Sequence, residues 1–123
     1  MPRILIIDDE IGIRRPLQVL LERAGYEVDS AANGVEALRR WRERPGDLVI
    51  TDIHMPEKNG LATIIELRHI APHARILAMS GSDLTDRIDV LGDAAMLGAI
   101  RTIAKPFRLE EMLLAVKHAL AEA

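Results

Sequence analysis

The sequence predicts an α/β fold: a doubly wound, five-stranded parallel sheet in the strand order 2-1-3-4-5, with five helices. Strand-like and helix-like patterns alternate about five times along the 123 residues, which is typical of a parallel sheet covered by helices on both faces. Several strand-like segments are short, uninterrupted aliphatic runs, as expected for strands buried on both faces. We expect strands near residues 3–8, 27–31, 47–52, 74–80 and 99–104.

Length and composition restrict the class of protein. A chain of 123 residues supports one hydrophobic core, so we expect a single domain over residues 1–123. No apolar stretch approaches the roughly 18 residues of a membrane helix, and a signal-peptide pattern is absent. Cysteine is also absent, so we expect a cytoplasmic protein without disulfides or thiolate metal sites. The net charge of -3 gives no electrostatic reason for direct binding to nucleic acid or to a membrane.

The first helix is expected between the first two strands. Its apolar residues recur at helical spacing: Ile13, Leu17, Leu20, Leu21 and Ala24. Gly25 is expected to end this helix, because glycine readily adopts the left-handed conformation of a helix terminus. We place Pro16 near the first turn, where the missing N–H is least harmful.

The later helices have clear start and stop signals. Asn33 followed by Glu36 resembles a capping box that opens the second helix, and Pro45-Gly46 ends it. The buried side of this helix is predicted to carry Val35, Leu38 and Trp41. Three further helices are expected at about Leu61 to Ile70, Thr85 to Leu97 and Leu109 to Leu120.

Polar residues follow four of the predicted strands at the point where each strand ends. Asp8 and Asp9 follow the first aliphatic run, and Asp52 follows the third. Ser80 and Lys105 follow the fourth and the fifth. Because the carboxyl ends of parallel strands meet at one edge of a sheet, we expect these side chains to converge there. A single Asp could simply end a strand or cap the next helix, but five suitable residues at four strand ends favour a common site.

The chemistry of these residue types indicates a cation and a phosphoryl group. Carboxylates packed closely together need a counter-charge. Magnesium prefers oxygen ligands and typically combines one or two carboxylates with water and phosphate oxygens. Lys105 offers a positive point charge for a phosphoryl oxygen, and Ser80 offers a hydroxyl donor. Asp52 is the best candidate nucleophile, because a carboxylate can accept a phosphoryl group as an acyl phosphate.

Four short motifs give the chain a family resemblance. They are Ile4-Leu5-Ile6-Ile7-Asp8-Asp9-Glu10, Asp52-Ile53-His54-Met55-Pro56, Met79-Ser80-Gly81 and Lys105-Pro106-Phe107. Over essentially its whole length the chain resembles the response-regulator receiver domain of two-component signalling. The resemblance implies a flavodoxin-like fold and a cis peptide bond between Lys105 and Pro106.

The resemblance also implies roles for the residues at the strand ends. Asp52 matches the phosphoacceptor of the family. Asp8 and Asp9 match the acidic pair that binds Mg²⁺, together with Asp52 and the backbone carbonyl of His54. Lys105 matches the lysine that contacts the phosphoryl group.

Further roles concern the switch and the lifetime of the phosphorylated state. Ser80 matches the hydroxyl residue that turns toward the phosphoryl group. The family commonly has an aromatic residue three positions before the lysine, but this chain has Thr102, which cannot fill the same space as a ring. His54 and Ser82 match positions that border the route of water and tune the lifetime, although both could equally be solvated loop side chains.

By resemblance, a histidine kinase or a phosphotransfer protein donates the phosphoryl group from a phosphohistidine to Asp52. The domain supplies most catalytic groups for its own phosphorylation and dephosphorylation, so it is expected to be a signalling switch and not primarily an enzyme. Phosphorylation shifts the population of two states, and the surface of the fourth helix, fifth strand and fifth helix then changes its partner preference. Met1 and the lack of a linker favour a stand-alone domain over the receiver portion of a longer chain. The kinase, the output partner and the oligomeric state have no signal in the sequence.

Three alternatives remain at the level of sequence. A degenerate receiver could act only as a protein-interaction module, as Thr102 suggests. An aspartyl-phosphate phosphohydrolase of the haloacid dehalogenase type would want a second acid two residues after its nucleophile, where this chain has His54. A flavodoxin-type cofactor carrier is disfavoured, because the acidic residues that follow the first strand would repel the phosphate of the cofactor.

Overall fold

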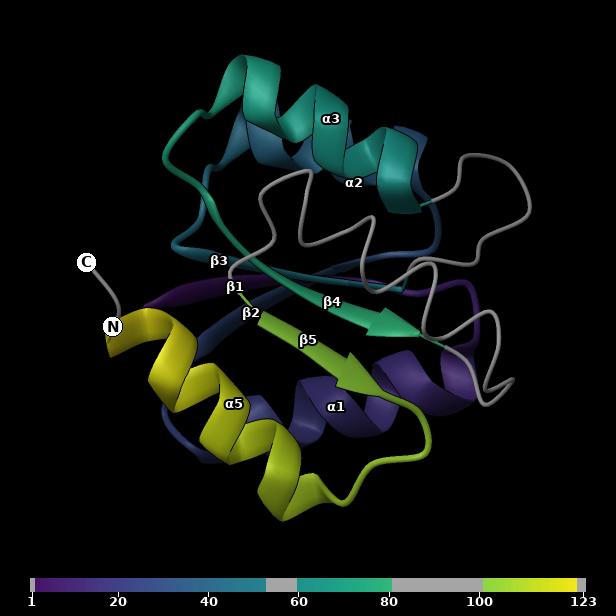
Figure 1. Ribbon diagram of the computed structural model, residues 1–123, viewed down its shortest axis with the longest axis vertical. Coiled ribbons are helices and arrows are strands. Elements are labelled where there is room, and N and C mark those ends of the chain that lie inside the picture. The colour runs from purple at the N-terminus through teal and green to yellow at the C-terminus, as the bar shows by residue number, and fades with distance from the viewer. Residues whose placement is uncertain (1, 53–59, 81–100, 122–123) are drawn as a thin grey trace.

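A computed structural model gives the architecture of the protein and describes residues 2–52, 60–80 and 101–121 (Figure 1). The five strands form one parallel sheet in the order β2-β1-β3-β4-β5, as predicted. The strands are β1 (Arg3–Ile7), β2 (Glu27–Ala31), β3 (Leu48–Asp52), β4 (Arg75–Ser80) and β5 (Arg101–Ala104). The helices are α1 (Ile11–Arg23), α2 (Gly34–Glu43), α3 (Gly60–Ile70) and α5 (Leu109–Ala121). The helix expected at about residues 85–97 lies outside the described residues.

Helices cover both faces of the sheet, so the molecule has three layers. Figure 1 shows α1 and α5 on one face and α2 and α3 on the other. Successive strand residues point to opposite faces, and β1 therefore supplies Ile4 and Ile6 to one core and Leu5 and Ile7 to the other. This explains why the strands read as continuous aliphatic runs. Within the described part of the chain, no helix is both long and apolar enough to cross a membrane.

Helix α1 begins earlier than its apolar pattern indicates. It starts at Ile11, so Pro16 is its sixth residue and lies inside the helix, beyond the first turn where we predicted it. The prediction was wrong because the apolar repeat starts only at Ile13. The proline leaves the carbonyl of Gly12 without its usual intrahelical donor. Gly25 ends the segment as expected, with a φ of 99° that favours glycine.

The start of α2 carries the predicted cap with one difference. The Asn33 side chain accepts a hydrogen bond of 2.9 Å from the backbone N–H of Glu36. The Glu36 carboxylate accepts a bond of 3.2 Å from the N–H of Ala32, and a capping box would instead use that of Asn33. The two hydrogen bonds still hold the chain where it enters α2.

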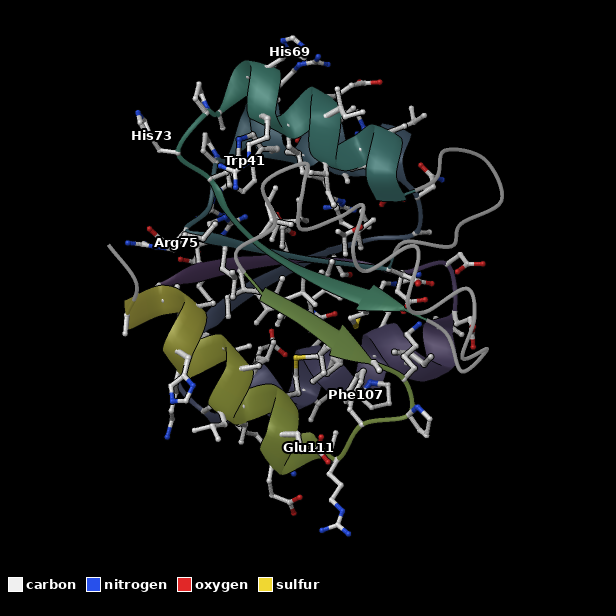
Figure 2. The ribbon with its side chains drawn as sticks, in the orientation of Figure 1. Trp41, His69, His73, Arg75, Phe107 and Glu111 are labelled. Atoms are coloured by element: carbon white, nitrogen blue, oxygen red, sulfur yellow. The ribbon has the colours of Figure 1, made fainter. Side chains whose placement is uncertain are left out.

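The buried stripe of α2 is narrower than predicted. Leu38 and Trp41 are buried as expected, and Trp41 lies among the side chains between the sheet and the helices of that face (Figure 2). Val35 is 61% exposed, so its predicted burial was wrong. The stripe runs through Gly34 and Ala37, and Val35 lies at its edge, turned to solvent. In α5 the predicted apolar face is confirmed at Met112 and Val116, which are buried. Leu109, in the first turn of this helix, is 48% exposed.

Candidate functional site

Three charged side chains meet at the carboxyl edge of the sheet. Asp8 follows β1 directly, Asp52 is the last residue of β3, and Lys105 follows β5 directly. In each case the residue two positions earlier packs into the core beneath α1 and α5. These residues are Ile6, Ile50 and Ile103. Because strand side chains alternate between the faces, the charged residues continue along the same side and converge.

The ammonium of Lys105 lies between two buried carboxylates. Its Nζ is 2.9 Å from Oδ2 of Asp8 and 3.3 Å from Oδ2 of Asp52. The side chain of Asp8 is 0% exposed, and those of Asp52 and Lys105 are 5% and 13% exposed. Burial lowers the pKa of Lys105, but the hydrogen bond to Asp8 and the charges of Asp52 and Asp8 outweigh it, so the pKa is raised. Lys105 is therefore a fixed positive charge at neutral pH.

Asp8 is held at several further points. Its Oδ1 accepts a hydrogen bond of 2.9 Å from the N–H of Glu10. The backbone carbonyl of Asp8 accepts a bond of 2.6 Å from Nη1 of Arg14, a residue of α1. Sequence reasoning gave Arg14 no role, because nothing in its own pattern indicates that it reaches back to the end of β1. These bonds fix the turn that carries the acidic residues.

An acidic group suited to a hard cation lies at the end of β1. Carboxylate oxygens of Asp8, Asp9 and Glu10 all lie within 4.8 Å of one another, and Asp9 and Glu10 are exposed. An all-oxygen donor set with two solvent-facing members fits Mg²⁺, which keeps several waters. Glu10 adds to the predicted pair. The carboxylate of Asp52 is not one of these three and contacts Lys105.

The hydroxyl of Thr51 forms a hydrogen bond with the backbone of Asp52. Thr51 is 0% exposed, and its Oγ1 donates a hydrogen bond of 3.0 Å to the backbone carbonyl of Asp52. Sequence reasoning did not assign Thr51 a role. The signal was present as a hydroxyl residue that closes the aliphatic run from Leu48.

Two of the other predicted site residues lie in described strands, and two lie outside the described part of the chain. Ser80 is the last residue of β4 and is paired in register with Ala104, the residue before Lys105. Thr102 lies within β5. His54 and Ser82 lie outside the described residues. The predicted cis bond between Lys105 and Pro106 is confirmed.

An open cavity of about 630 Å³ borders this edge on the side of α1. Its lining combines α1 with the segment after β5. The lining residues are Glu10, Gly12, Ile13, Pro16, Leu17, Lys105, Pro106, Phe107 and Leu109. Lys105 thus contacts the buried carboxylates and also faces a space that opens to solvent.

Comparison with known sequences and structures shows the family of this chain. The family model of the response regulator receiver domain matches residues 4–117, and the chain therefore belongs to that family. The chain is 35% identical over 119 residues to the chemotaxis protein CheY of Bacillus subtilis, covering 96% of this chain and 97% of that protein. The receiver domain of NtrX from Brucella abortus has a TM-score of 0.91 at 30% identity and covers 98% of this chain and 99% of that chain.

Other relatives are much longer than this chain. It is 39% identical over 118 residues to the DNA-binding transcriptional regulator NtrC of Azospirillum brasilense, covering 95% of this chain and 24% of that protein. It covers 26% of the transcriptional regulatory protein ZraR of Klebsiella oxytoca at 36% identity, with 96% of this chain matched. The domain is a phosphoacceptor receiver of two-component signalling, and receivers of this family are switches that generally bind Mg²⁺ at an acidic cluster like the one after β1.

Proposed function

We propose that Asp52 accepts a phosphoryl group from the phosphohistidine of a histidine kinase or a phosphotransfer protein. The observation that carries this proposal is the contact of one ammonium, on Lys105, with the carboxylates of Asp52 and Asp8 at the ends of three strands. A carboxylate that is buried and adjacent to a fixed positive charge is suited to a developing acyl phosphate.

The transfer forms one bond to phosphorus and breaks one, and it needs no further reactant. An oxygen of the Asp52 carboxylate attacks phosphorus, the P–N bond of the phosphohistidine breaks, and the imidazole nitrogen takes the electron pair. The Lys105 ammonium lies where it stabilises negative charge on the transferred oxygens. Its raised pKa keeps it protonated throughout.

Asp8 and Asp9, together with Asp52 and the backbone carbonyl of His54, are proposed to hold Mg²⁺. The three-carboxylate group after β1 supports this proposal and adds Glu10 as a further candidate. A bound magnesium ion would offset the negative charge of the carboxylates and the phosphoryl oxygens. Asp8 orients the three-carboxylate group through its hydrogen bonds with the backbone N–H of Glu10 and the ammonium of Lys105.

Ser80 and Thr102 are proposed as the switch residues, and His54 and Ser82 as positions that tune the lifetime of the acyl phosphate. Phosphorylation shifts the population toward the state that binds the phosphoryl group better. The output partner is proposed to bind the surface formed by the predicted fourth helix, β5 and α5.

Incubation with acetyl phosphate and MgCl₂, followed by intact mass measurement, tests the proposal. We expect a gain of one phosphoryl group on the native chain, a loss of that gain when EDTA removes the metal, and no gain for Asp52→Asn. The matched control is Asp29→Asn, a carboxylate of β2 away from this edge, which keeps the gain. An equal gain in Asp52→Asn, or none in the native chain, contradicts the proposal.

A further inference from the structure

We propose that Thr51 is a positioning residue for phosphoryl transfer, because its hydroxyl fixes the backbone of Asp52 at the end of β3. The inference deepens the proposed function and rests on Asp52 being the phosphoacceptor. Nothing in the comparisons or in the sequence motifs assigns a role to Thr51.

The surroundings of Thr51 are dry and apolar. It is 0% exposed, and its register partners in the neighbouring strands are Ile7 and Ala78, which are also 0% exposed. Ile7 and Ala78 belong to the core beneath α2 and α3, opposite the face on which Asp52 meets Lys105. A hydroxyl in such a place needs a partner within the protein, because water does not reach it.

The partner of the hydroxyl is the site residue itself. Oγ1 of Thr51 lies 3.0 Å from the backbone oxygen of Asp52. Asp52 is consequently held on two sides of the sheet: its carboxylate contacts Lys105 on one face, and its carbonyl is tied to a side chain that belongs to the other face. Because the peptide unit is planar, fixing the carbonyl also fixes the orientation of the plane in which the strand ends.

This restraint acts on the attacking atom. Asp52 is the last residue of β3 and is paired in register with Met79 of β4. The bond from Thr51 adds a side-chain restraint on its carbonyl. With the peptide units on both sides of Asp52 held, the direction of its Cα–Cβ bond is fixed. This limits where the carboxylate lies relative to the ammonium of Lys105 and to an incoming phosphorus atom. Small displacements of a reacting group have large effects on rate, since catalysis of phosphoryl transfer is mainly positioning and charge stabilisation.

Two matched pairs of variants separate the hydroxyl from the rest of the side chain. Thr51→Val keeps the shape and removes the hydroxyl. Thr51→Ser and Thr51→Ala both lose the methyl group and differ from each other only in the hydroxyl. The measurement is the initial rate of acyl-phosphate formation over a range of acetyl phosphate concentrations in MgCl₂, with thermal unfolding of each variant recorded in parallel.

We expect Thr51→Val and Thr51→Ala to lower the maximal rate by about tenfold, as for a small misplacement of the reacting carboxylate, with little change in the concentration at half-maximal rate. Thr51→Ser should lie within about twofold of the native rate. A purely structural role predicts the opposite ranking, in which the rate follows the unfolding temperature and the serine variant is impaired along with alanine.

The outcomes are distinguishable from failure of the proposed function. If Thr51→Val and Thr51→Ala react at the native rate, the positioning role is overturned while Asp52 remains the acceptor. If serine fails as badly as alanine, the methyl group and not the hydroxyl matters, and the inference is also overturned. If Asp52→Asn in the same assay is still phosphorylated, the proposed function fails first. Should the valine variant not fold, the serine and alanine pair decides.

Discussion

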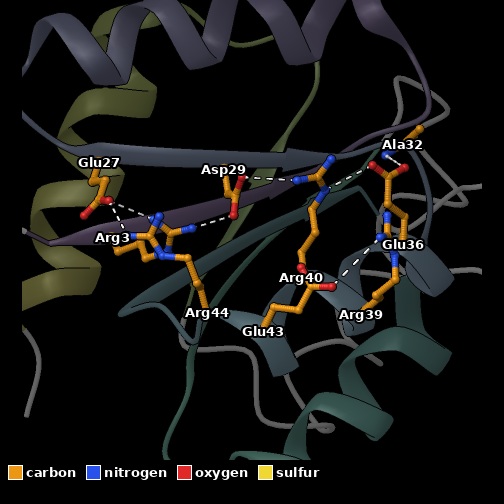
Figure 3. Close-up of polar contacts among 9 residues, drawn as sticks. All are labelled: Arg3, Glu27, Asp29, Ala32, Glu36, Arg39, Arg40, Glu43 and Arg44. Atoms are coloured by element: carbon orange, nitrogen blue, oxygen red, sulfur yellow. Dashed lines mark hydrogen bonds and ion pairs between the residues drawn. The ribbon is translucent and has the colours of Figure 1, made fainter.

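Two charged regions of the molecule differ in how their charges are balanced. Between β1, β2 and α2, guanidinium groups alternate with carboxylates, and each charged group pairs with one of opposite sign (Figure 3). We call this set the ion-pair network; its members are Arg3, Glu27, Asp29, Glu36, Arg40 and Arg44. At the carboxyl edge, by contrast, two buried carboxylates share the ammonium of Lys105, and two exposed acids lie close by.

The ion-pair network is a structural arrangement. Asp29 lies between the guanidinium groups of Arg3 and Arg40, at 2.5 Å and 3.4 Å. Glu27 joins Arg3 and Arg44 in the same way, at 3.0 Å and 2.8 Å. These pairs are partly exposed and connect β1, β2 and α2, so each contributes little and no charge is left to attract a ligand.

The carboxyl edge keeps an excess of negative charge at some expense of stability. Asp8 and Asp52 are buried almost completely. Among the described residues, the carboxylates of Asp8, Asp9, Glu10 and Asp52 outnumber the cations beside them, which are Lys105 and Arg14. Burying charge without full compensation is unfavourable. The proposed site therefore differs from the ion-pair network in its local imbalance of charge and not in its charge density.

Removing the ammonium at the carboxyl edge should have the largest effect on stability. We expect Lys105→Met to lower the free energy of unfolding by about 3 kcal/mol in the absence of Mg²⁺, because Asp8 and Asp52 then repel each other in a buried setting. Urea unfolding measures the change, and Lys117→Met on the exposed side of α5 is the matched control. Addition of MgCl₂ should restore part of the loss. A variant as stable as the native protein would show that Lys105 does not offset the two carboxylates.

Removing one carboxylate from the ion-pair network should have a smaller effect. We expect Asp29→Asn to lower the free energy of unfolding by about 1 kcal/mol, because two guanidinium groups lose their shared acceptor. The loss should shrink at high salt, where exposed charges are screened. Glu43→Gln is the control, since its contact with Arg39 is 4.0 Å and both side chains are more than 60% exposed. Equal effects of the two substitutions would contradict the difference in burial.

The smallest expected effect is a pH dependence within the ion-pair network. Burial raises the pKa of Glu36, but the hydrogen bond from Ala32 and the contacts with Arg40 and Arg39 outweigh it, so the pKa is lowered from 4.5. A lowered pKa stabilises the folded state above pH 4.5, and this contribution is lost as the pH falls through the folded value. We expect Glu36→Gln to unfold about 0.5 kcal/mol more easily at neutral pH, with the difference disappearing in acid.

Urea unfolding of the native protein and Glu36→Gln at pH 7 and at several values below 4.5 would test this expectation. The two curves should converge as the pH decreases. A difference that persists unchanged in acid would mean that the glutamate acts through packing and not through its charge.

Local signals in the sequence were reliable where one segment decides the outcome. Gly25 ends its segment, Asn33 caps α2, and each aliphatic run forms a strand, because these features depend on residues a few positions apart. Predictions that depend on the exact path of a helix were less reliable. Val35 is exposed and Pro16 lies inside α1, since the apolar repeat indicates a helix better than it indicates the first residue or the edge of the stripe.

The strands and the residues at the carboxyl edge of the sheet could be predicted from the amino-acid sequence, because short patterns encode strand alternation and strand ends. How those residues contact one another could be found only from the three-dimensional structure. The contact of Lys105 with Asp8 joins positions 97 residues apart, and no local pattern encodes its length. The same holds for the contact of Lys105 with Asp52. These depend on the register and packing of separate strands, which are set by the fold as a whole.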